Sequence, residues 1–530
     1  MNDKRHQIPE LLQELNGLQK GNSKEVSLQT GIPEADIYGV GSFYHLLADP
    51  NTKIRVCTGL SCRMSGADEI LETAKKMGLP TAECSCLAAC DKPPAVLRDR
   101  ATLPQVTVES IEETEGDWEK LMSDFAGDKK SWKGEVGPKI DDPEKLPLNL
   151  LGKQNFDGNG LKKTLSQTPE VTIKEIENSG LQGRGGAGFP AAFKWNAVLK
   201  QEEKTRYVVL NADEGEPGTF KDREIMLRRP DLVIEGLAIA AKVIGAKEIY
   251  LYLRGEFEFP KVEMRKAIQG FKDNGLLEDL EFHFHDGQGA YICGEETALL
   301  EALEGKRGMP RLKPPFPVEK GLWQKPTLIH NVETIACIPS IVSRGGKWFK
   351  DLGITEPGIK LYCISGHVKN PGIYEMPLGI TLDELVEEAG GYIGRLKAFS
   401  PGGASSGFLP ASFRNVPLDF KGLQKTGSML GSAGVVVLND SINMKWAVAQ
   451  QLEFFERESC GQCAPCRIGT RYLREALESK IDGTESSNKP SLEFTEDVSW
   501  QMTEGSICGL GQIASLPLTS AQKYFPKDFE

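Results

Sequence analysis

The chain has 530 residues, of which 39% are hydrophobic and 26% charged, and its formal net charge is −12. This length predicts roughly three to five folded domains, and the acidic balance disfavours nonspecific binding to nucleic acid. No apolar run approaches the ~18–20 residues of a membrane span, and the first residues lack the apolar core of an export signal. We therefore expect a cytoplasmic protein without membrane insertion, whose 12 cysteines serve metal ligation rather than disulfides.

The N-terminal part is predicted to contain short helices and a small α/β domain. Leucines at helical spacing indicate helices over residues 1–48. Residues 49–125 alternate strand, helix and strand patterns, which is typical of an α/β unit. The polar residues 126–148 follow and are predicted to be a linker.

Two pairs of cysteines lie in this α/β unit, and each pair follows a predicted strand. The spacings are Cys57-x4-Cys62 and Cys86-x3-Cys90. Two pairs on neighbouring loops can hold a [2Fe-2S] cluster with two thiolates per iron, and a zinc site is the alternative. Cys84 is interpreted as a packed spectator, because Cys86 fits the loop spacing better.

The largest block, residues 149–352, is predicted to be an α/β domain. Strand patterns at 206–212, 248–253 and 281–285 are each followed by a glycine-rich or acidic turn and then by a helical pattern. This alternation predicts ligand sites at the carboxyl ends of the strands.

A glycine-rich loop in this block is predicted to bind an anion. Gly183, Gly185 and Gly188 match G-x-G-x-x-G, but a helical pattern precedes them where the dinucleotide fingerprint requires a strand. Such a loop exposes backbone N–H groups, and Arg184 and Lys194 add positive charge. We favour a phosphate or dinucleotide cradle over a flexible linker.

Charged side chains follow two further turns of the block. Three carboxylates in an acidic turn, Asp213, Glu214 and Glu216, could bind Mg²⁺, could hydrogen-bond a ligand, or could form a solvated turn. A predicted helix begins near Glu295 and leads to a basic cluster that suits an anionic substrate such as a nucleotide pyrophosphate. The basic cluster consists of Lys306, Arg307, Arg311 and Lys313.

The last two predicted domains are residues 353–438 and residues 439–530. A hairpin followed by a helix over residues 359–391 suggests a β-grasp-like domain, and the C-terminal part reads as helical. In the helical part, a C-x2-C-x2-C triple and one remote thiol suit a [4Fe-4S] cube, whereas zinc sites usually use two C-x2-C pairs. The four thiols are Cys460, Cys463, Cys466 and Cys508.

Five motifs between residues 150 and 515 together resemble the NADH-oxidising flavoprotein subunit of respiratory complex I and its soluble relatives in NAD-linked hydrogenases and formate dehydrogenases. Residues 8–100 resemble the thioredoxin-like [2Fe-2S] subunit of the same complexes, through YGVGSFYHLL, CTGLSC and CLAAC. The chain therefore resembles a fusion of two subunits. The five motifs are GLQGRGGAGFPAAFKW, NADEGEPGTFKDRE, GAYICGEETALLEALEGKRGMPRLKPPFP, HNVET and ESCGQCAPCRIGT with the later CGLG.

The resemblance implies a multidomain α/β protein with a thioredoxin-like [2Fe-2S] domain, a Rossmann-like FMN/NADH domain, a β-grasp (SLBB-like) domain and a C-terminal helical bundle with [4Fe-4S]. It implies that FMN occupies the glycine-rich loop and that NADH stacks over it. No residue acts as an acid or base, since FMN carries the chemistry. The implied FMN residues are Gly183, Arg184, Gly185, Gly186, Lys194, Asn211, Asp213, Glu214, Tyr291, Gly294, Glu295, Glu296, Asn331 and Thr334. The implied NADH residues are Phe189, Glu216, Lys313 and Phe316.

Three features depart from the family pattern. The interval between Cys62 and Cys86 is shorter than in the stand-alone [2Fe-2S] protein, His330 stands where relatives often have asparagine, and Ala197 replaces an aromatic residue of some relatives. The last change leaves Phe189 and Phe316 with more of the stacking on the adenine.

The predicted function is that of an NADH dehydrogenase or diaphorase-type subunit, which passes single electrons through the two clusters to or from a catalytic partner. The sequence has no ligand pattern for molybdopterin, tungsten or nickel, so a partner is required. We favour the alpha-type subunit of an NAD-dependent formate dehydrogenase, because the cluster domain is fused and no ferredoxin module is added. A hydrogenase or another NADH:acceptor complex is the alternative. A non-enzymatic electron relay with a decayed NADH site is a further alternative, and the intact motifs count against it.

Overall fold

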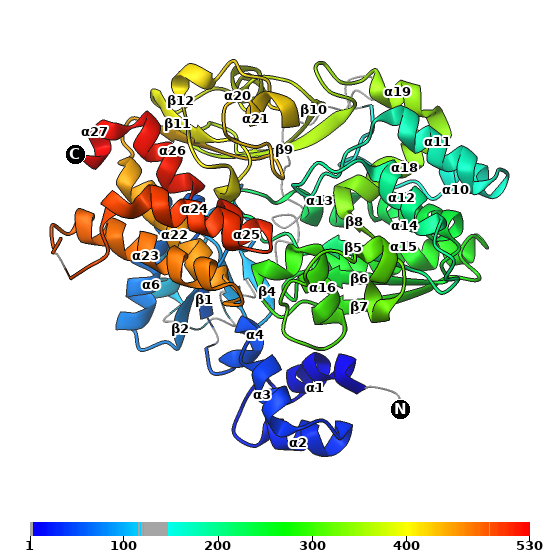
Figure 1. Cartoon of the computed structure of the whole chain (residues 1–530), viewed down its shortest axis with the longest axis horizontal. Coiled ribbons are helices and arrows are strands. Elements are labelled where there is room, and N and C mark those ends of the chain that lie inside the picture. The colour runs from blue at the N-terminus through cyan, green and yellow to red at the C-terminus, as the bar shows by residue number, and fades with distance from the viewer. Residues whose placement is uncertain (1–3, 53, 115–116, 118–119, 121–146, 487) are drawn as a thin grey trace.

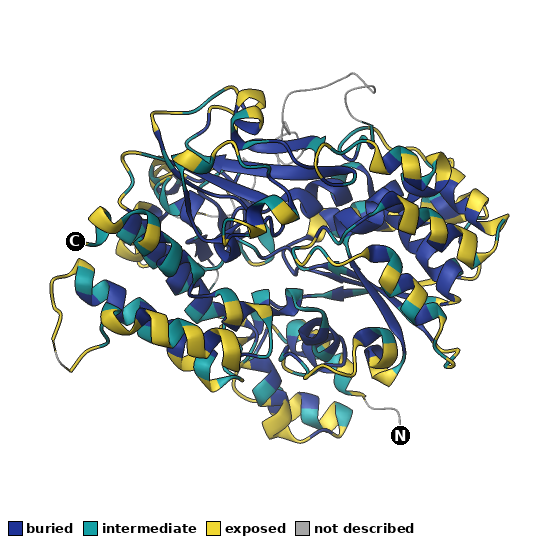
Figure 2. Cartoon of the chain, turned by 45° about the horizontal axis from the view of Figure 1, so that its top comes forward, coloured by how far each residue is buried: buried dark blue, intermediate teal, exposed yellow. Residues whose placement is uncertain are grey.

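The computed structural model describes residues 4–52, 54–114, 117, 120, 147–486 and 488–530. Three sheets form the frame of the molecule, and helices surround them (Figure 1). The strands are mostly buried, while the exposed residues gather on the outer helices (Figure 2). None of the helices in these ranges is long and apolar enough to cross a membrane. Most of the predicted linker, residues 126–146, lies outside the described residues.

The N-terminal sheet carries the first two cysteine pairs. Its strand order is β2-β1-β3-β4, with β1 and β2 parallel and the other pairings antiparallel. Helix α6 packs on this sheet through Ile70, Leu71 and Ala74, and its acidic first turn and basic last turn complement the helix dipole. The bounds are β1 Ile54–Cys57, β2 Thr81–Cys84, β3 Val96–Arg98, β4 Ala101–Leu103, α5 Leu60–Arg63, α6 Ala67–Lys76 and α7 Val108–Glu113.

The central sheet is entirely parallel and has the order β7-β6-β5-β8. The chain moves outward from β5 to β7 and then crosses to the other side of β5 to form β8. The topological switch point therefore lies at the carboxyl ends of the neighbouring strands β5 and β8. Open α/β sheets bind ligands at this position. The strand bounds are β5 Tyr207–Ala212, β6 Glu248–Leu253, β7 Glu281–Asp286 and β8 Thr327–Asn331.

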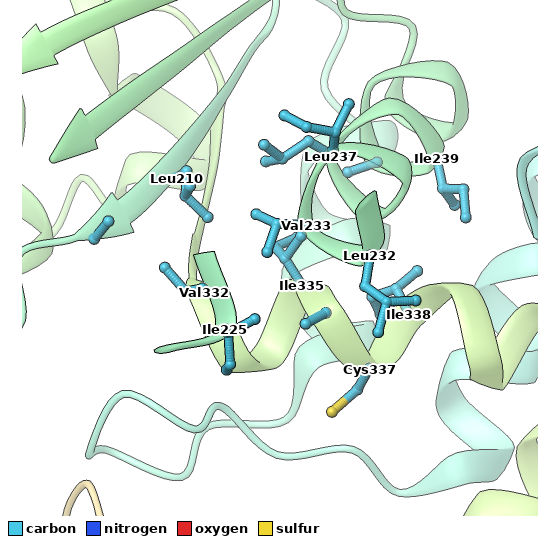
Figure 3. Packing of buried hydrophobic residues seen from close by; sticks show 14 of the residues in the cluster. Leu210, Ile225, Leu232, Val233, Leu237, Ile239, Val332, Ile335, Cys337 and Ile338 are labelled. Atoms are coloured by element: carbon cyan, nitrogen blue, oxygen red, sulfur yellow. The ribbon is translucent and has the colours of Figure 1, made fainter. Parts of the chain in front are cut away.

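Two faces of the central sheet contribute to two different cores. Val208 and Leu210 join α14 and α18 in one core, and Figure 3 shows this packing around Leu210. Val209 points to the other core, which α16 and the N-terminal helices share. The alternation follows from the two-residue period of a strand. The helix bounds are α12 Ala191–Leu199, α13 Lys221–Arg228, α14 Pro230–Ile244, α15 Glu258–Asp273, α16 Glu296–Leu303 and α18 Val332–Arg344.

The third sheet has the order β10-β9-β13-β11-β12. The predicted hairpin is present as β9 and β10, and the helix after it is α20, which begins with a capping box between Thr381 and Glu384. Strand β13 is the central strand of this sheet, and it pairs in parallel with β9 and antiparallel with β11. The bounds are β9 Ile359–Gly366, β10 Gly372–Pro377, α20 Leu382–Glu388, β11 Leu396–Ser400, β12 Leu409–Pro410, α21 Phe420–Gln424 and β13 Gly434–Asn439.

The C-terminal part is helical, as expected, and packs beside the N-terminal sheet (Figure 1). Helices α22 and α23 form a hairpin, and α24 and α25 pack on α23. The bounds are α22 Met444–Glu458, α23 Ala464–Ile481, α24 Thr495–Gly505, α25 Gly509–Ile513, α26 Leu516–Tyr524 and α27 Pro526–Phe529. The other α-helices within the described residues are α1 Ile8–Glu14, α2 Asn22–Thr30, α3 Glu34–Gly41, α4 His45–Ala48, α10 Asn159–Leu165, α11 Pro169–Ser179, α17 Pro317–Lys320 and α19 Gly346–Lys350.

Candidate functional site

A cavity of about 360 Å³ lies at the carboxyl ends of β5 and β8. It is therefore at the switch point of the central sheet. Segments that are far apart in the sequence form its wall: the glycine-rich loop, the acidic turn, the segment before α16, loops of the third sheet and α25. The predicted residues in the wall are Gly185, Gly186, Asn211, Asp213, Glu214, Glu216, Tyr291, Gly294, Glu295 and Asn331.

The glycine-rich loop folds back on itself and leads into α12. The Gly183 N–H donates to the carbonyl of Phe189 over 2.8 Å, and the Arg184 N–H donates to Thr334 Oγ1 over 2.8 Å. A Cβ on Gly185 would come within 3.0 Å of Asn331 Cβ, so the loop lies directly against the end of β8. The side chain of Arg184 is fully buried and contacts the carbonyl of Pro357 instead of lining the cavity.

The three carboxylates of the acidic turn have three different environments. Glu214 accepts the N–H groups of Asp222 and Arg223 over 2.8 and 3.1 Å, so it caps the start of α13. Glu216 accepts the Ser405 N–H over 2.8 Å and the hydroxyl of Tyr291.

Asp213 differs from its two neighbours. Its Oδ2 atom has no hydrogen-bond partner within the described part of the chain, and burial raises its pKa to about 8. The three carboxylates of the turn do not converge into a group that could hold a metal ion, so the Mg²⁺ interpretation of the turn has no geometric support.

A row of alternating charges lies beside the cavity. Lys194 pairs with Glu296 over 2.7 Å, and Lys313 bridges Glu296 and Glu295 over 2.9 and 2.8 Å. Burial opposes ionisation of Glu296, but the two lysines outweigh it and lower its pKa to about 2. The carboxylate is therefore charged at neutral pH.

The sequence-based interpretation of the basic cluster needs a correction, because carboxylates neutralise much of it. Arg311 pairs with Glu301 and Glu304, and Lys306 pairs with the same two residues. The sequence analysis counted only the basic residues and overlooked these partners, which lie on α16 and at its C-terminal end.

Three phenylalanine rings, in the glycine-rich loop, on α12 and directly before α17, are exposed. Phe189 and Phe316 are 45% and 49% exposed, and Phe193 is 61% exposed and packs edge-to-face on Phe189. Exposed rings of this size are candidates for stacking on a planar ligand. Phe193 was not among the predicted site residues.

His330 lies one residue before the cavity, on β8. Its Nε2 accepts the indole N–H of the fully buried Trp195 over 2.9 Å, and burial lowers its pKa to about 3. The neutral ring thus joins α12, which follows the glycine-rich loop, to the strand that carries Asn331.

The C-terminal thiols meet next to the cavity. Cys463 is the N-cap of α23, Cys508 is the N-cap of α25, and a Cβ on Gly511 would lie 2.9 Å from Cys466 Cβ. Burial raises the pKa of Cys466, and the charges of the nearby Cys460 and Cys463 raise it further. Gly509, Leu510 and Ile513 line the cavity, so the segment that carries Cys508 forms part of its wall.

The N-terminal thiols also come together. Cys86 Sγ lies 3.5 Å from Cys90 Sγ, and Cys57 makes sulfur contacts with Cys62 and Cys86. All four thiols are buried. The two pairs therefore lie close enough to share one metal centre, and a [2Fe-2S] cluster takes two thiolates per iron in this way.

Several wall residues were missed by the sequence analysis. They come from the loops of the third sheet, where no periodic pattern signals a site, from the acidic turn and the start of α13, and from α25. Single residues come from the glycine-rich loop and from the segment before α16. Runs of small residues at 401–407 and 427–434 are the sequence signal that could have indicated these loops as part of a ligand site. The missed residues are Ala187, Gly215, Thr219, Lys221, Asp222, Ile292, Gly402, Ser405, Met429, Gly431, Ser432, Gly509, Leu510 and Ile513.

Four family models match the chain in consecutive order. A thioredoxin-like [2Fe-2S] ferredoxin model matches residues 7–116, and a Nuo51 FMN-binding domain model matches residues 176–340. An SLBB domain model matches residues 361–409, and the model of the NADH-ubiquinone oxidoreductase-F iron-sulfur binding region matches residues 446–530. Together with the cavity and the two thiol groups, these matches define a flavin- and iron–sulfur-binding oxidoreductase subunit.

Curated relatives place the chain within this class. The F 2 subunit of the NADH-quinone oxidoreductase of Rhizobium meliloti is 48% identical over 382 residues, which cover 70% of this chain and 90% of the relative. The F subunit of the Rickettsia typhi enzyme of the same name is 42% identical, and the match covers 74% of this chain and 98% of that protein. The chain belongs to the family of the F subunits of NADH-quinone oxidoreductases, and it carries a thioredoxin-like [2Fe-2S] domain in front of the part that they share.

A solved structure resembles the whole chain. A chain of the NAD⁺-reducing [NiFe]-hydrogenase in the H2-reduced state has a TM-score of 0.87 and 28% identity, and the match covers 100% of this chain and 93% of that chain. The air-oxidised state of the same enzyme gives the same TM-score. The predicted fold class, with its four kinds of domain, is thereby confirmed.

Proposed function

We propose that the chain is the NAD(H)-linked diaphorase subunit of a larger oxidoreductase. The observation that supports this proposal most strongly is the composition of the cavity wall. Both the glycine-rich loop and the segment after Cys508 line the cavity at the switch point. When bound, FMN supplies the conversion between hydride transfer and single-electron transfer. The protein supplies position, exclusion of water and a short exit for electrons.

The fourteen FMN residues implied by the resemblance have related tasks in this proposal. Gly185 and Gly186 bring backbone to the cavity without a side chain, and Asn211 and Asn331 present amides from the ends of β5 and β8. Lys194, Glu295 and Glu296 supply charge beside it. Asp213, Glu214, Tyr291 and Gly294 complete the lining, while Gly183, Arg184 and Thr334 hold the loop in shape.

NADH enters, in this proposal, over the exposed aromatic rings. Phe189 and Phe316 offer faces for stacking, and Phe193 enlarges the same surface. Glu216 is held inside the cavity by Tyr291 and Ser405, where it can accept hydrogen bonds from a nucleotide. Lys313 leaves its carboxylate partners when an anionic nucleotide competes for it.

The eight predicted thiols serve as cluster ligands in the same proposal. Cys460, Cys463, Cys466 and Cys508 hold the [4Fe-4S] cluster, which takes one thiolate per iron. The [2Fe-2S] cluster takes two per iron from Cys57, Cys62, Cys86 and Cys90.

For the catalytic partner we propose the alpha-type subunit of an NAD-dependent formate dehydrogenase, in a cytoplasmic complex. A hydrogenase is the second candidate, because the NAD⁺-reducing [NiFe]-hydrogenase chain matches this one over its full length. Purifying the native complex without air and identifying the copurifying protein separates the two: a molybdenum or tungsten protein supports the first, and a nickel protein supports the second.

The diaphorase activity itself is tested on the anaerobically purified chain. Addition of NADH should bleach the flavin absorbance near 450 nm and reduce the clusters, because hydride transfer needs no partner. Flavin that stays oxidised in excess NADH would support the electron-relay alternative. A preparation with zinc in place of iron and without flavin would overturn the proposal.

A further inference from the structure

A buried arginine connects the wall of the cavity with the loop that carries Cys86. Arg254 follows β6 directly and is 9% exposed. Its Nη1 donates to the carbonyl of Glu214, a wall residue, and its Nη2 donates to the carbonyl of Cys86 over 2.6 Å. Glu256 holds the guanidinium in place by accepting its Nε–H over 3.0 Å.

A second buried arginine reaches the same loop from α13. Arg223 is 5% exposed, and its Nη1 donates to the carbonyl of Ala88. Its Nη2 lies 3.3 Å from Asp91 Oδ1, just beyond the fourth thiol, and Glu224 accepts its Nε–H. Two guanidinium groups of the central domain thus hold residues 86–91 of the N-terminal domain.

We propose that Arg254, assisted by Arg223, is a positioning residue that fixes the Cys86–Cys90 loop and raises the reduction potential of the [2Fe-2S] cluster bound there. The inference rests on the proposed function only in assigning the cluster to these thiols. The N-terminal domain does not hold this loop by itself, because two carbonyl groups of the loop accept hydrogen bonds from arginines of the flavin domain.

The direction of the effect follows from the hydrogen bonds of the guanidinium group as well as from its charge. Reduction adds an electron to a cluster that thiolates already make negative, and hydrogen bonds and positive charge nearby favour the reduced form. The guanidinium is buried away from water. Charges in the protein interior interact more strongly than charges at the surface. A lysine at position 254 keeps the charge but cannot span two carbonyls and a carboxylate, because it lacks the planar fork of arginine.

The test is a redox titration of the [2Fe-2S] EPR signal in the anaerobic full-length holoprotein, with dithionite and mediators and without NADH. In Arg254→Lys we expect the ratio of reduced to oxidised cluster at fixed ambient potential to fall about tenfold, which equals 59 mV for one electron. The FMN content and the [4Fe-4S] signal should stay unchanged.

Arg229→Lys is a matched control. Arg229 is also buried, pairs with an acid two residues later, Asp231, over 2.8 Å, and donates to a distant carbonyl, that of Asn149, over 2.7 Å. No thiol of the cluster lies among these partners. This variant should leave the ratio at its original value, and a fall equal to that of Arg254→Lys would overturn the proposal.

Glu256→Gln provides a test with the opposite sign, which also serves if Arg254→Lys does not fold. It removes a negative charge and leaves an amide oxygen to accept from Arg254, so the ratio should rise. Ratios within twofold of the original in both variants, or a fall in both, would overturn the proposal. An unmodified chain without any [2Fe-2S] signal would instead overturn the cluster assignment of the proposed function.

Discussion

At the residue scale, neighbouring side chains of the same type perform different tasks because their surroundings differ. Glu214 gives its oxygens to backbone N–H groups of α13, and burial raises its pKa to about 7. Asp213, one residue earlier, keeps an oxygen without a partner among the described residues, in the wall of the cavity. The two acidic residues have the same type of side chain, but their hydrogen bonds differ. Glu214 caps a helix, whereas Asp213 has an oxygen that is available to a ligand.

The remote thiol gives a prediction at this scale. In Cys508→Ala, the [4Fe-4S] EPR signal should be lost, because one iron loses its thiolate, while bound flavin and the [2Fe-2S] signal remain. Cys337→Ala is the control, because Cys337 lies on α18 and its thiol is fully buried in the hydrophobic core. This variant should leave every cofactor signal in place. Normal cube spectra in Cys508→Ala would show that the ligand assignment is wrong.

At the element scale, the glycine-rich loop owes its function to its backbone. Gly188 has a φ angle of +62°, a left-handed backbone conformation that residues other than glycine rarely adopt. A Cβ there would also lie 2.7 Å from the ring of Phe420 at the start of α21. The loop is therefore held between β8 and the third sheet, with little room for a side chain.

Gly188→Ala should lower stability by roughly 1–2 kcal/mol through the left-handed backbone and weaken FMN binding by displacing the loop from Phe420. Flavin fluorescence titration and the thermal midpoint measure the two effects. Gly427→Ala is the matched control, because Gly427 has φ +80° but nothing within 4 Å of a new Cβ. It should lower stability without changing FMN affinity, and equal flavin loss in both variants would contradict the prediction.

The sequence predicted elements with a strong local signal. The strand patterns before the acidic turns became β5, β6 and β7, and the thiol spacings identified two groups that do converge. Strand β8 and the hairpin of β3 and β4 were not predicted, because short buried strands lack a period of their own. The cavity wall from the third sheet and the contact of Arg254 with Cys86 depend on long-range packing, which no local pattern encodes.

At the scale of the whole molecule, buried charges join the central domain to the third sheet. Lys360 on β9 pairs with Glu333 on α18, and Lys221 lies 3.1 Å from the same carboxylate. All three side chains are fully buried. Burial opposes ionisation of Glu333, yet the two lysines lower its pKa, so the carboxylate stays charged.

Glu333→Gln should lower the free energy of unfolding by about 3–5 kcal/mol, because it leaves two buried ammonium groups with too little negative charge. Thermal and urea denaturation of the apoprotein measure the effect. Glu203→Gln is the control: its partner Lys325 lies 2.5 Å away, but both side chains are 39% exposed, so stability should hardly change. Equal midpoints for the two variants would contradict the prediction.

The composite wall of the cavity also has a consequence for biosynthesis. Gly185 and Gly186 leave the ribosome early, whereas Gly509, Leu510 and Ile513 are translated near the other end of the chain. A nascent polypeptide that has not yet produced α25 has an open side where the prosthetic group would sit. The cavity wall is therefore complete only after nearly the whole chain has been synthesised.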